Sequence, residues 1–263
     1  MDREDGVGLN PIPRVEILGV GISAIDMRMA VTEIGRWIET GQSRYACITG
    51  VHGVMESQRD PELRSIHNRS GLTTPDGMPM VWCARRAGAK WTDRVSGPDL
   101  MLEVADVAAR EGWTSFFYGG KEGVADLLAS KLTDRFPGFR TVGTLCPPFR
   151  NLTAQESAEV RDRINDAAPQ ILWVGLSTPK QERWMAANVP LLNTPATLGV
   201  GAAFDLNAGL VKRAPYWMQR SGLEWLFRLG TEPRRLWRRY LRNNPEFLMR
   251  LMLNPPKLVE AWE

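Results

Sequence analysis

Short apolar runs alternate with amphipathic stretches through most of the 263-residue chain, and this alternation limits the folds open to it. Five runs have the length and side-chain content of buried strands. They are Tyr45–Thr49, Ser115–Tyr118, Arg140–Leu145, Ile171–Leu176 and Thr197–Val200. Between them, Pro98–Arg110 and Lys121–Phe136 repeat apolar residues at helical spacing, and Thr153–Ala168 opens with a candidate capping box of Thr153 and Glu156. The alternation predicts an α/β fold of Rossmann-like type, with a parallel or mixed sheet and helices on both faces.

The composition fits an ordinary globular enzyme, with 43% hydrophobic and 24% charged residues. Cys47, Cys83 and Cys146 are scattered, so neither a disulfide framework nor a zinc site is expected. His52 and His67 are not paired with cysteine or carboxylate at ligand spacing, and no metal is expected. The first residues are polar and acidic, and no run of eighteen apolar residues occurs. The sequence therefore predicts a cytoplasmic protein without a signal peptide or a spanning helix.

Positive charge is concentrated at the C-terminal end. From Lys212 onward there are eleven Lys or Arg against five Glu, which leaves 22 basic and 25 acidic residues before it. Aromatic and arginine side chains interleave between Tyr216 and Met252, and two or three short helices broken near Pro233 and Pro245 are expected. We therefore divide the chain into a catalytic domain, residues 1–212, and a small helical appendage, residues 213–263.

The appendage arginines have three interpretations: a solvated face, a nucleic-acid site, or a surface for a membrane and lipid phosphates. Interleaved aromatics and arginines on helices favour the membrane interface. The planar guanidinium also suits a diphosphate, because it donates two hydrogen bonds at once. Nucleic acid is not an expected partner, since the rest of the chain is not basic and carries no recognised motif.

Polar residues that follow the predicted strands are the candidates for chemistry, because open α/β sheets bind ligands at the carboxyl ends of their strands. Asp76, between Pro75 and Gly77, is either a general base in a cleft or part of a plain turn. Tyr118–Gly119–Gly120–Lys121 opens a helix and suits a nucleotide or, equally, a tight turn. Pro179–Lys180–Gln181–Glu182 is either a helix start or a ligand contact through Gln181.

Taken together, the segments resemble the bacterial WecG/TagA/CpsF glycosyltransferase family over about residues 17–245. The resemblance rests on eight short motifs that occur in order. They are Pro75–Asp76–Gly77, Arg94–Val95–x–Gly97–Pro98–Asp99–Leu100, Gly119–Gly120–Lys121–x–Gly123, Pro179–Lys180–Gln181–Glu182, Gly201–x–x–Phe204–Asp205, Lys212–Arg213–Ala214–Pro215–x–Trp217–Met218–Gln219, Leu223–Glu224–Trp225–Leu226–x–Arg228 and Glu232–Pro233–x–Arg235.

The resemblance implies a metal-independent, inverting transfer from a UDP-sugar to a saccharide on a polyprenyl diphosphate, in cell-surface polysaccharide synthesis (exopolysaccharide, capsule or teichoic acid). It implies no cofactor and a peripheral position on the inner face of the cell membrane. It also implies that the appendage is mobile and completes the active site. By analogy, Asp76 is the general base and Arg94 orients substrate. Gly119, Gly120, Lys121, Gln181 and Asp205 belong to the donor site, and Arg228, Arg235 and Arg238 hold diphosphate charge.

The chain departs from the family after the first predicted strand. The family commonly has Thr-x-Asn there, whereas this chain has Ile48–Thr49–Gly50–Val51–His52. Thr49 or His52 would then replace the missing contact to sugar or base. The donor sugar stays open among mannosaminuronic acid, N-acetylmannosamine, glucose and glucuronic acid. The residues around His52 and Asp76 look closer to the exopolysaccharide branch and favour glucose or glucuronic acid.

Two rival functions give different expectations. A nucleotide-dependent oxidoreductase needs a glycine-rich fingerprint after the first strand, where only Gly50 and Gly53 occur. A non-enzymatic lipid- or nucleic-acid-binding protein would work through its C-terminal arginines alone. Neither explains why the Asp, Arg and Gln motifs occur in this order. The acceptor saccharide, the linkage, the order of substrate binding and the oligomeric state are left open, and a homo-oligomer is among the options.

Overall fold

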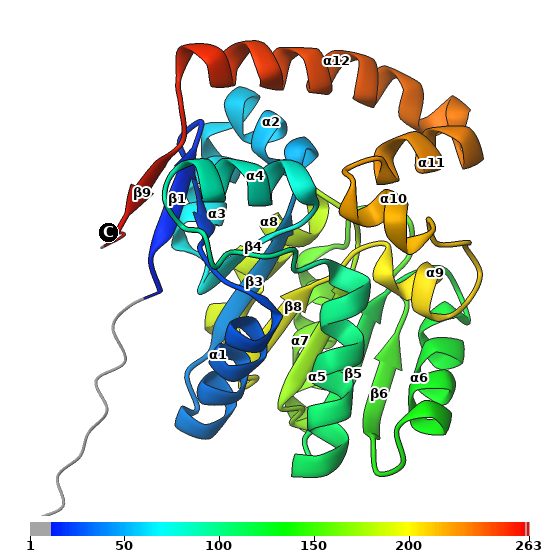
Figure 1. The fold of residues 1–263 in the computed structure, drawn as a ribbon. Helices are drawn as coiled ribbons and strands as arrows, with labels where there is room; N and C mark the ends of the chain where they lie inside the picture. Colours follow the sequence, from blue (N-terminus) through cyan, green and yellow to red (C-terminus); the bar gives the residue numbers. More distant parts are fainter. Residues whose placement is uncertain (1–11, 261, 263) are drawn as a thin grey trace, which may run out of the picture.

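The computed structural model of the protein describes residues 12–260 and 262. Its centre is a six-stranded parallel sheet with strand order β4-β3-β8-β7-β5-β6 (Figure 1). These strands are β3 (Arg44–Thr49), β4 (Leu72–Pro75), β5 (Thr114–Gly119), β6 (Arg140–Leu145), β7 (Ile171–Gly175) and β8 (Ala196–Gly199). The five predicted strands and the α/β fold class are confirmed.

Strand β4 was not predicted because it has no apolar run. Its sequence is Leu-Thr-Thr-Pro, and both threonines are buried. The Thr73 hydroxyl donates to the His67 carbonyl at 2.9 Å, and the Thr74 hydroxyl donates to the Val95 carbonyl at 3.0 Å. These bonds satisfy the buried hydroxyls, so a polar sequence can form this buried edge strand.

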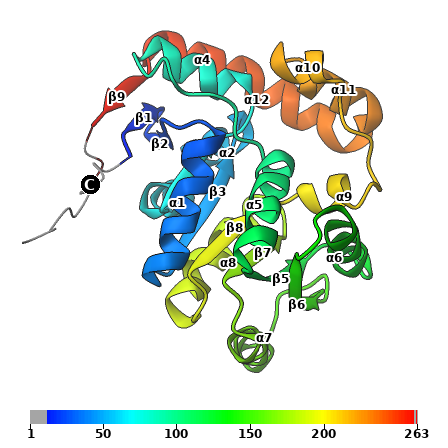
Figure 2. The same cartoon turned by 60° about the horizontal axis from the view of Figure 1, so that its bottom comes forward.

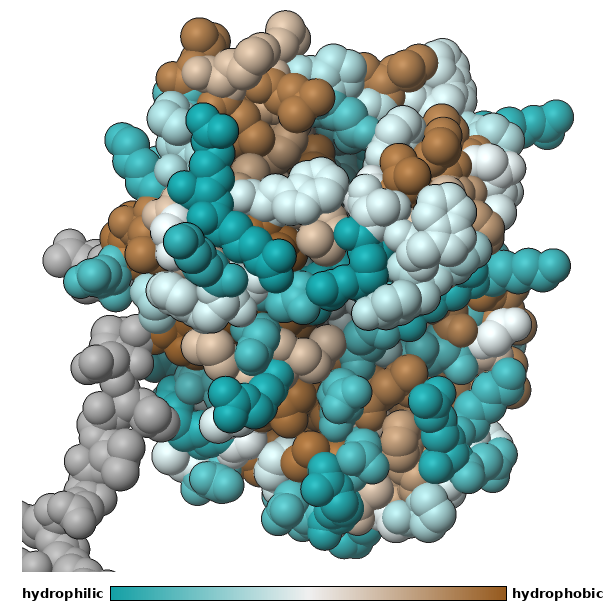
Figure 3. Space-filling view, in the orientation of Figure 1, coloured by the Kyte–Doolittle hydropathy of each residue, from teal (hydrophilic) through white to brown (hydrophobic). Residues whose placement is uncertain are grey.

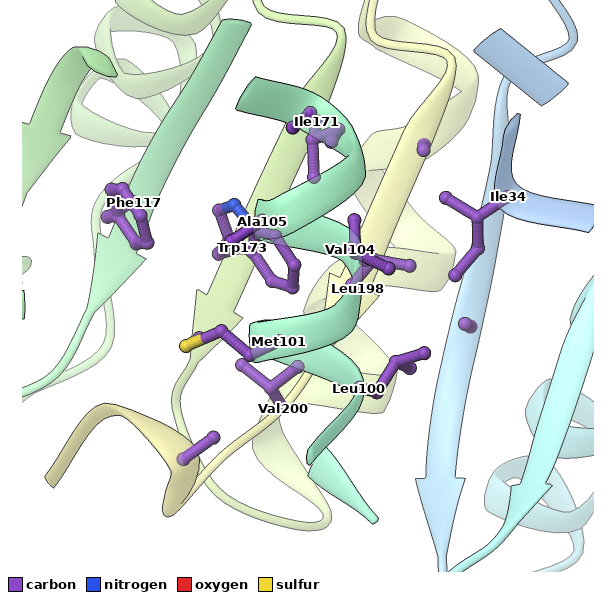
Figure 4. Close-up of a cluster of buried hydrophobic side chains, with 14 of the residues drawn as sticks. Ile34, Leu100, Met101, Val104, Ala105, Phe117, Ile171, Trp173, Leu198 and Val200 are labelled. Atoms are coloured by element: carbon purple, nitrogen blue, oxygen red, sulfur yellow. The ribbon is translucent and has the colours of Figure 1, made fainter. Parts of the chain in front are cut away.

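Helices cover both faces of the sheet, as predicted. One face is covered by α1 (Met27–Thr40), α5 (Gly97–Glu111), α6 (Val124–Arg135) and α9 (Ala203–Asn207). The other face is covered by α3 (Pro61–Arg69), α7 (Ala154–Ala167), α8 (Lys180–Asn188) and the short 3₁₀ helix η1 (Val189–Leu191). Figure 4 shows the first core, where α5 packs over β7 and β8. Phe117 and Trp173 stack there with ring centroids 6.3 Å apart. Two apolar layers therefore hold the sheet rigidly in place.

A second, antiparallel sheet has the order β2-β1-β9, formed by β1 (Arg14–Ile17), β2 (Val20–Ser23) and β9 (Lys257–Val259). Its side chains share a core with α2 (Val51–Arg59), α4 (Met78–Arg86) and Phe247 from the C-terminal end of the chain. This sheet was not predicted, because its strands are only three or four residues long. Strand β9 thereby fixes the C-terminal segment to the start of the chain.

The C-terminal segment contains α10 (Tyr216–Arg220), α11 (Glu224–Thr231) and α12 (Pro233–Leu253). Figures 1 and 2 show these helices together along one side of the molecule, with α12 across α2 in Figure 1. Pro233 lies in the first turn of α12, but the predicted break near Pro245 is wrong, because α12 continues through it. Pro245 removes only the hydrogen bond to the Leu241 carbonyl, and residue 241 is exposed to water. Burial of Phe247 helps to keep the helix in one piece.

Candidate active site

A large cavity lies between the carboxyl ends of the parallel strands and the C-terminal helices. Its volume is about 950 Å³. Residues that follow β3, β4, β7 and β8 form one side, and residues of α10, α11 and α12 form the other. The predicted site residues that line it are His52, Asp76, Arg94, Gln181, Arg228 and Arg235. These residues from distant parts of the sequence therefore line one cavity at the carboxyl edge of the sheet, and their roles stay predictions.

Asp76 follows β4 and lines this cavity. Its backbone is fixed by a hydrogen bond from its N–H to the Thr49 carbonyl, 3.0 Å long. A Cβ at Gly50 would lie 2.7 Å from the Asp76 carbonyl, so only glycine allows β3 and β4 to end this close together. Within residues 12–260 and 262, no donor hydrogen-bonds the Asp76 carboxylate. It is therefore free to accept a proton from a ligand.

The pKa of Asp76 is raised to about 6, and burial is the main cause. The positive charge of Arg94 opposes this rise, while the negative charge of Glu224 adds to it. A carboxylate with such a pKa is mostly ionised at pH 7 and is a stronger base than an exposed aspartate. The charge environment thus suits Asp76 to proton abstraction near neutral pH.

Arg94 lies beside Asp76 with its side chain only 6% exposed. One terminal nitrogen donates to Asp99 at 2.9 Å and to the Gln219 side-chain oxygen at 3.2 Å. The other donates to Glu224 at 2.8 Å. Two of these three acceptors belong to the C-terminal segment, which therefore reaches the centre of the site.

Asp99 is shared between several donors at the start of α5. Besides Arg94, it accepts hydrogen bonds from the Ser96 hydroxyl at 2.6 Å and from Arg213 at 2.5 Å. Arg213 begins the C-terminal segment, so this carboxylate also connects the sheet to that segment. Its charge is balanced locally, which leaves Asp76 as the carboxylate open to the cavity.

Gln181 begins α8 and is 2% exposed. Its side-chain nitrogen donates to the Gly199 carbonyl at 2.9 Å, which fixes the amide plane across the ends of β7 and β8. Among the described residues, its oxygen Oε1 has no hydrogen-bond partner. A buried acceptor without a donor is costly, so this oxygen is a good contact point for a ligand N–H or O–H. Ser177, just before it, also lines the cavity and has φ of +68°. Such backbone strain gathers at functional sites.

His52 occupies the first turn of α2 and contacts the C-terminal segment, because its Nδ1 lies 3.3 Å from the Asn243 side-chain nitrogen. Burial is the main cause that lowers the pKa of His52, and together with the positive charges of Arg239, Arg59 and Arg228 it brings the pKa to about 4. The imidazole is therefore neutral at pH 7 and can serve as a hydrogen-bonding group rather than a charge.

Positive charge enters the cavity from α11 and α12. Arg228 and Arg235 line it, together with Arg239, which sequence reasoning missed. Arg238 lies outside the cavity lining, and its guanidinium packs 5.1 Å from the centroid of the Trp237 ring. The α12 residues 235 and 239 are one turn apart and so lie on neighbouring positions of one face.

The other predicted contacts are also outside the cavity lining: Thr49, Gly119, Gly120, Lys121 and Asp205. Gly119 has φ of +118°, and a Cβ there would lie 2.7 Å from the Gly175 carbonyl. The tight-turn interpretation therefore accounts for this glycine. The Thr49 hydroxyl is buried without a partner among the described residues. Its predicted role in donor binding, like those of Lys121 and Asp205, stays a prediction.

Gln219 and Glu224 are site residues that the sequence analysis did not assign. They lie 125 and 130 positions from Arg94, and a contact over that distance has no periodic signature. The only signal was their presence in two of the ordered motifs. In residues 12–260 and 262, no helix is long and apolar enough to cross a bilayer, and no three acidic, His or Cys side chains gather in a way that could hold a metal.

Comparison with known proteins identifies the relatives of this chain. The model of the glycosyl transferase WecG/TagA/CpsF family matches residues 15–259. An N-acetylglucosaminyldiphosphoundecaprenol N-acetyl-beta-D-mannosaminyltransferase of Bacillus subtilis (strain 168) is 31% identical over 183 residues, 70% of this chain and 69% of the relative. The enzyme with the same name from Bacillus spizizenii (strain ATCC 23059 / NRRL B-14472 / W23) is 30% identical over 186 residues, 71% of this chain and 70% of the relative. With the family match spanning both sheets and the whole cavity, this chain belongs to the WecG/TagA/CpsF family of glycosyltransferases.

Proposed function

We propose that the protein transfers a sugar from a UDP-sugar to a saccharide carried on a polyprenyl diphosphate, with inversion at the sugar carbon and without a metal. The observation that carries this proposal is the ionisable carboxylate of Asp76, free of hydrogen bonds from the described residues, facing Arg228 and Arg235 across one cavity. The relatives act, by their names, on N-acetylglucosaminyl-diphosphoundecaprenol, which supports a lipid-linked acceptor. Family membership argues against the oxidoreductase and the purely binding alternatives.

In the proposed reaction, the acceptor hydroxyl oxygen attacks the anomeric carbon of the donor sugar. Its proton passes to the Asp76 carboxylate as the new carbon–oxygen bond forms. The bond between that carbon and the UDP phosphate oxygen breaks, and UDP leaves with the electron pair. Arg228 and Arg235 would stabilise the charge that develops on the departing diphosphate. Gln181 would hold the donor through its free oxygen.

Part of the cavity lining is apolar and suits the lipid part of the acceptor. Trp82 of α4 and Phe247, Leu248 and Met252 of α12 belong to this part. Helix α12 also exposes large apolar side chains, and hydrophobic atoms gather at the top of Figure 3, where α12 lies. These exposed residues are Leu241, Leu248, Met249, Met252 and Leu253. Apolar side chains flanked by Arg favour the surface of an anionic membrane, so we place the enzyme there with α12 against the lipid.

Several sugars are candidates for the group that the donor carries. The relatives transfer N-acetylmannosamine, by their names, whereas the residues around His52 favour glucose or glucuronic acid. His52 is neutral and would hydrogen-bond a sugar hydroxyl rather than pair with a carboxylate. The polymer that receives the product, whether exopolysaccharide, capsule or teichoic acid, follows from the donor and the acceptor.

UDP release from purified protein tests the proposal. A panel of UDP-sugars is supplied in EDTA, with and without a short-chain polyprenyl-diphosphate-saccharide, in detergent or liposomes. We expect release that depends on the acceptor and on one donor. Release that needs a divalent cation would remove the metal-independent mechanism. No release with any donor, together with no thermal shift by UDP, would contradict the UDP-sugar assignment.

A further inference from the structure

Two side chains of the C-terminal segment hold Arg94. Gln219 of α10 is buried, and its nitrogen donates to the Ala214 carbonyl at 2.7 Å, which leaves its oxygen to accept from Arg94. Glu224, at the first position of α11, accepts from the other terminal nitrogen of Arg94 at 2.8 Å. The bond to Glu224 joins two opposite charges, so it is stronger than a neutral hydrogen bond.

These contacts matter because Arg94 is the charge that most opposes the rise in the pKa of Asp76. A guanidinium prefers to bind a carboxylate through two N–H groups, and a carboxylate bound in this way has a lowered pKa and is a weak base. In the structure, Asp99 and Glu224 each occupy one terminal nitrogen of Arg94. Within the described part of the chain, no ion pair of 4.0 Å or less joins Arg94 to Asp76.

Asp99 does not suffice to hold Arg94 alone. The oxygen that Arg94 contacts, Oδ2, also accepts from Ser96 and Arg213. Glu224 differs, because Arg94 is its hydrogen-bond partner among the described residues. If the C-terminal segment were to leave, Arg94 would lose both Glu224 and Gln219 and would turn to the nearest free carboxylate.

The charges that face Asp76 come from three elements. Arg94 lies in the segment between α4 and α5, Asp99 lies in α5, and Glu224 and Arg228 lie in α11. Only the last two belong to the C-terminal segment. Glu224 raises the pKa of Asp76 and Arg228 lowers it, so their direct effects oppose each other. Docking of the segment therefore changes the basicity of Asp76 chiefly because Glu224 binds Arg94.

We propose that Gln219 and Glu224 are positioning residues that hold Arg94 away from Asp76, so that docking of the C-terminal segment keeps Asp76 able to take a proton. This inference rests on the proposed function and deepens it. The segment then supplies more than arginines for the diphosphate, since it also controls the base. An undocked enzyme would carry an Arg94–Asp76 pair and would be slow to activate a hydroxyl, including that of water.

Glu224→Gln tests the proposal, because it keeps the size of the side chain and removes its charge. Losing a negative charge near Asp76 and freeing Arg94 both favour the ionised carboxylate. The midpoint of the Asp76 titration should fall by about one pH unit, a roughly tenfold change in its proton affinity. Glu224→Asp keeps the charge, and its midpoint should stay closer to that of the wild type.

Carboxyl-carbon NMR of aspartate-labelled full-length protein measures this midpoint directly, and the Asp76 signal is assigned by its loss in Asp76→Asn. The matched control is Glu246→Gln in α12. Glu246 pairs with Arg59 and Arg250 and does not contact Arg94, so this change removes the same charge from the segment and leaves the contacts of Arg94 in place. We expect a lower midpoint in Glu224→Gln and the wild-type midpoint in Glu246→Gln. An unchanged midpoint in Glu224→Gln, or an equal fall in both variants, would overturn the inference.

The acid limb of kcat for UDP release should move with the NMR midpoint. The NMR midpoint tests the role of Glu224, whereas turnover tests the proposed transferase function. A fall in the midpoint with no turnover on any donor would support the inference and count against the transferase assignment. Turnover in Glu224→Gln with the same acid limb as the wild type would leave the transferase in place and overturn the role of Glu224.

Discussion

The six-stranded body and the C-terminal segment, residues 213–263, are held in place by different forces. The body has an apolar core on each face of its sheet, and its central strands β7 and β8 are almost entirely buried. Helix α11 buries none of its eight residues, all of which the structure describes, and α12 buries three of twenty-one. The segment is held instead by ion pairs, by Phe247 and by strand β9.

The two regions therefore contribute differently to the site. The buried sheet holds Asp76 in a fixed position, because many packing contacts would have to break before Asp76 moved. Ion pairs at a surface each contribute little, so they attach the segment less firmly than an apolar core would. The proposed base therefore belongs to the rigid body, whereas the arginines that face it come from a segment with few buried residues.

Removal of the base should have the largest effect. Asp76→Asn should lower kcat about 10²- to 10⁴-fold, the usual contribution of a general base. Wild-type kcat should fall as pH drops through about 6, where Asp76 takes up its proton. The measurement is UDP release against pH with saturating donor and acceptor.

A measurement of thermal stability is the control for Asp76→Asn. The pKa of Asp76 is higher in the folded protein than in the unfolded chain. Between these two pKa values the folded state binds more protons, so it loses stability as pH rises. Replacing the ionised group by a neutral amide should therefore not lower Tm at pH 7. Near-normal turnover in a folded Asp76→Asn protein would remove the general-base assignment.

Loss of the segment's arginines comes next. Arg228→Ala and Arg235→Ala should each lower kcat/KM by about 10- to 100-fold, because each removes a charged donor from the diphosphate. Arg238→Ala should cost less, since that guanidinium packs on Trp237 outside the cavity lining. Steady-state kinetics on the three variants ranks them. Equal losses at 235 and 238 would show that α12 turns or shifts when substrates bind.

The same contrast between the two regions explains what the sequence could predict. Strands such as Ile171–Gly175 and helices such as Ala154–Ala167 are specified by local pattern and were predicted nearly to the residue. The predicted capping box at Thr153 and Glu156 is present. Strand β4 was missed because its threonines are satisfied by hydrogen bonds to distant backbone, which no local pattern records.

Long-range contacts limited the prediction of the site. Asp76 and Gln181 follow β4 and β7, so topology alone brings them to one edge of the sheet. The bond from Arg94 to Glu224 depends on how a charged segment folds back over 130 residues. Helix α12 stays continuous at Pro245, whereas local propensity predicts a break there.

A moderate effect is expected at the exposed face of α12. Leu241→Gln combined with Leu253→Gln should weaken binding to anionic vesicles by about tenfold, because less apolar area enters the lipid. Co-sedimentation measures the binding. Turnover of a short-chain acceptor in detergent should be nearly unchanged, since neither side chain lines the cavity. The matched control is Leu191→Gln with Leu210→Gln, two exposed leucines of the body. Equal weakening in both double variants would show that α12 has no special role in docking.

The smallest effect should come from the helix cap of α7, on the body. Thr153 is exposed, and its hydroxyl accepts from the N–H of Glu156 at 3.2 Å while the Glu156 carboxylate accepts from the N–H of Thr153 at 2.8 Å. Thr153→Ala should lower the free energy of unfolding by about 1 kcal/mol and Tm by about 2–4 °C. Turnover should not change, because α7 packs on the sheet through Val160 and Ile164 and takes no part in the cavity. Thermal unfolding and UDP release on the same preparation check both expectations. A loss of turnover at a temperature where the variant is folded would mean that strain in the body reaches Asp76, and the division of tasks between a rigid body and an adjustable segment would then fail.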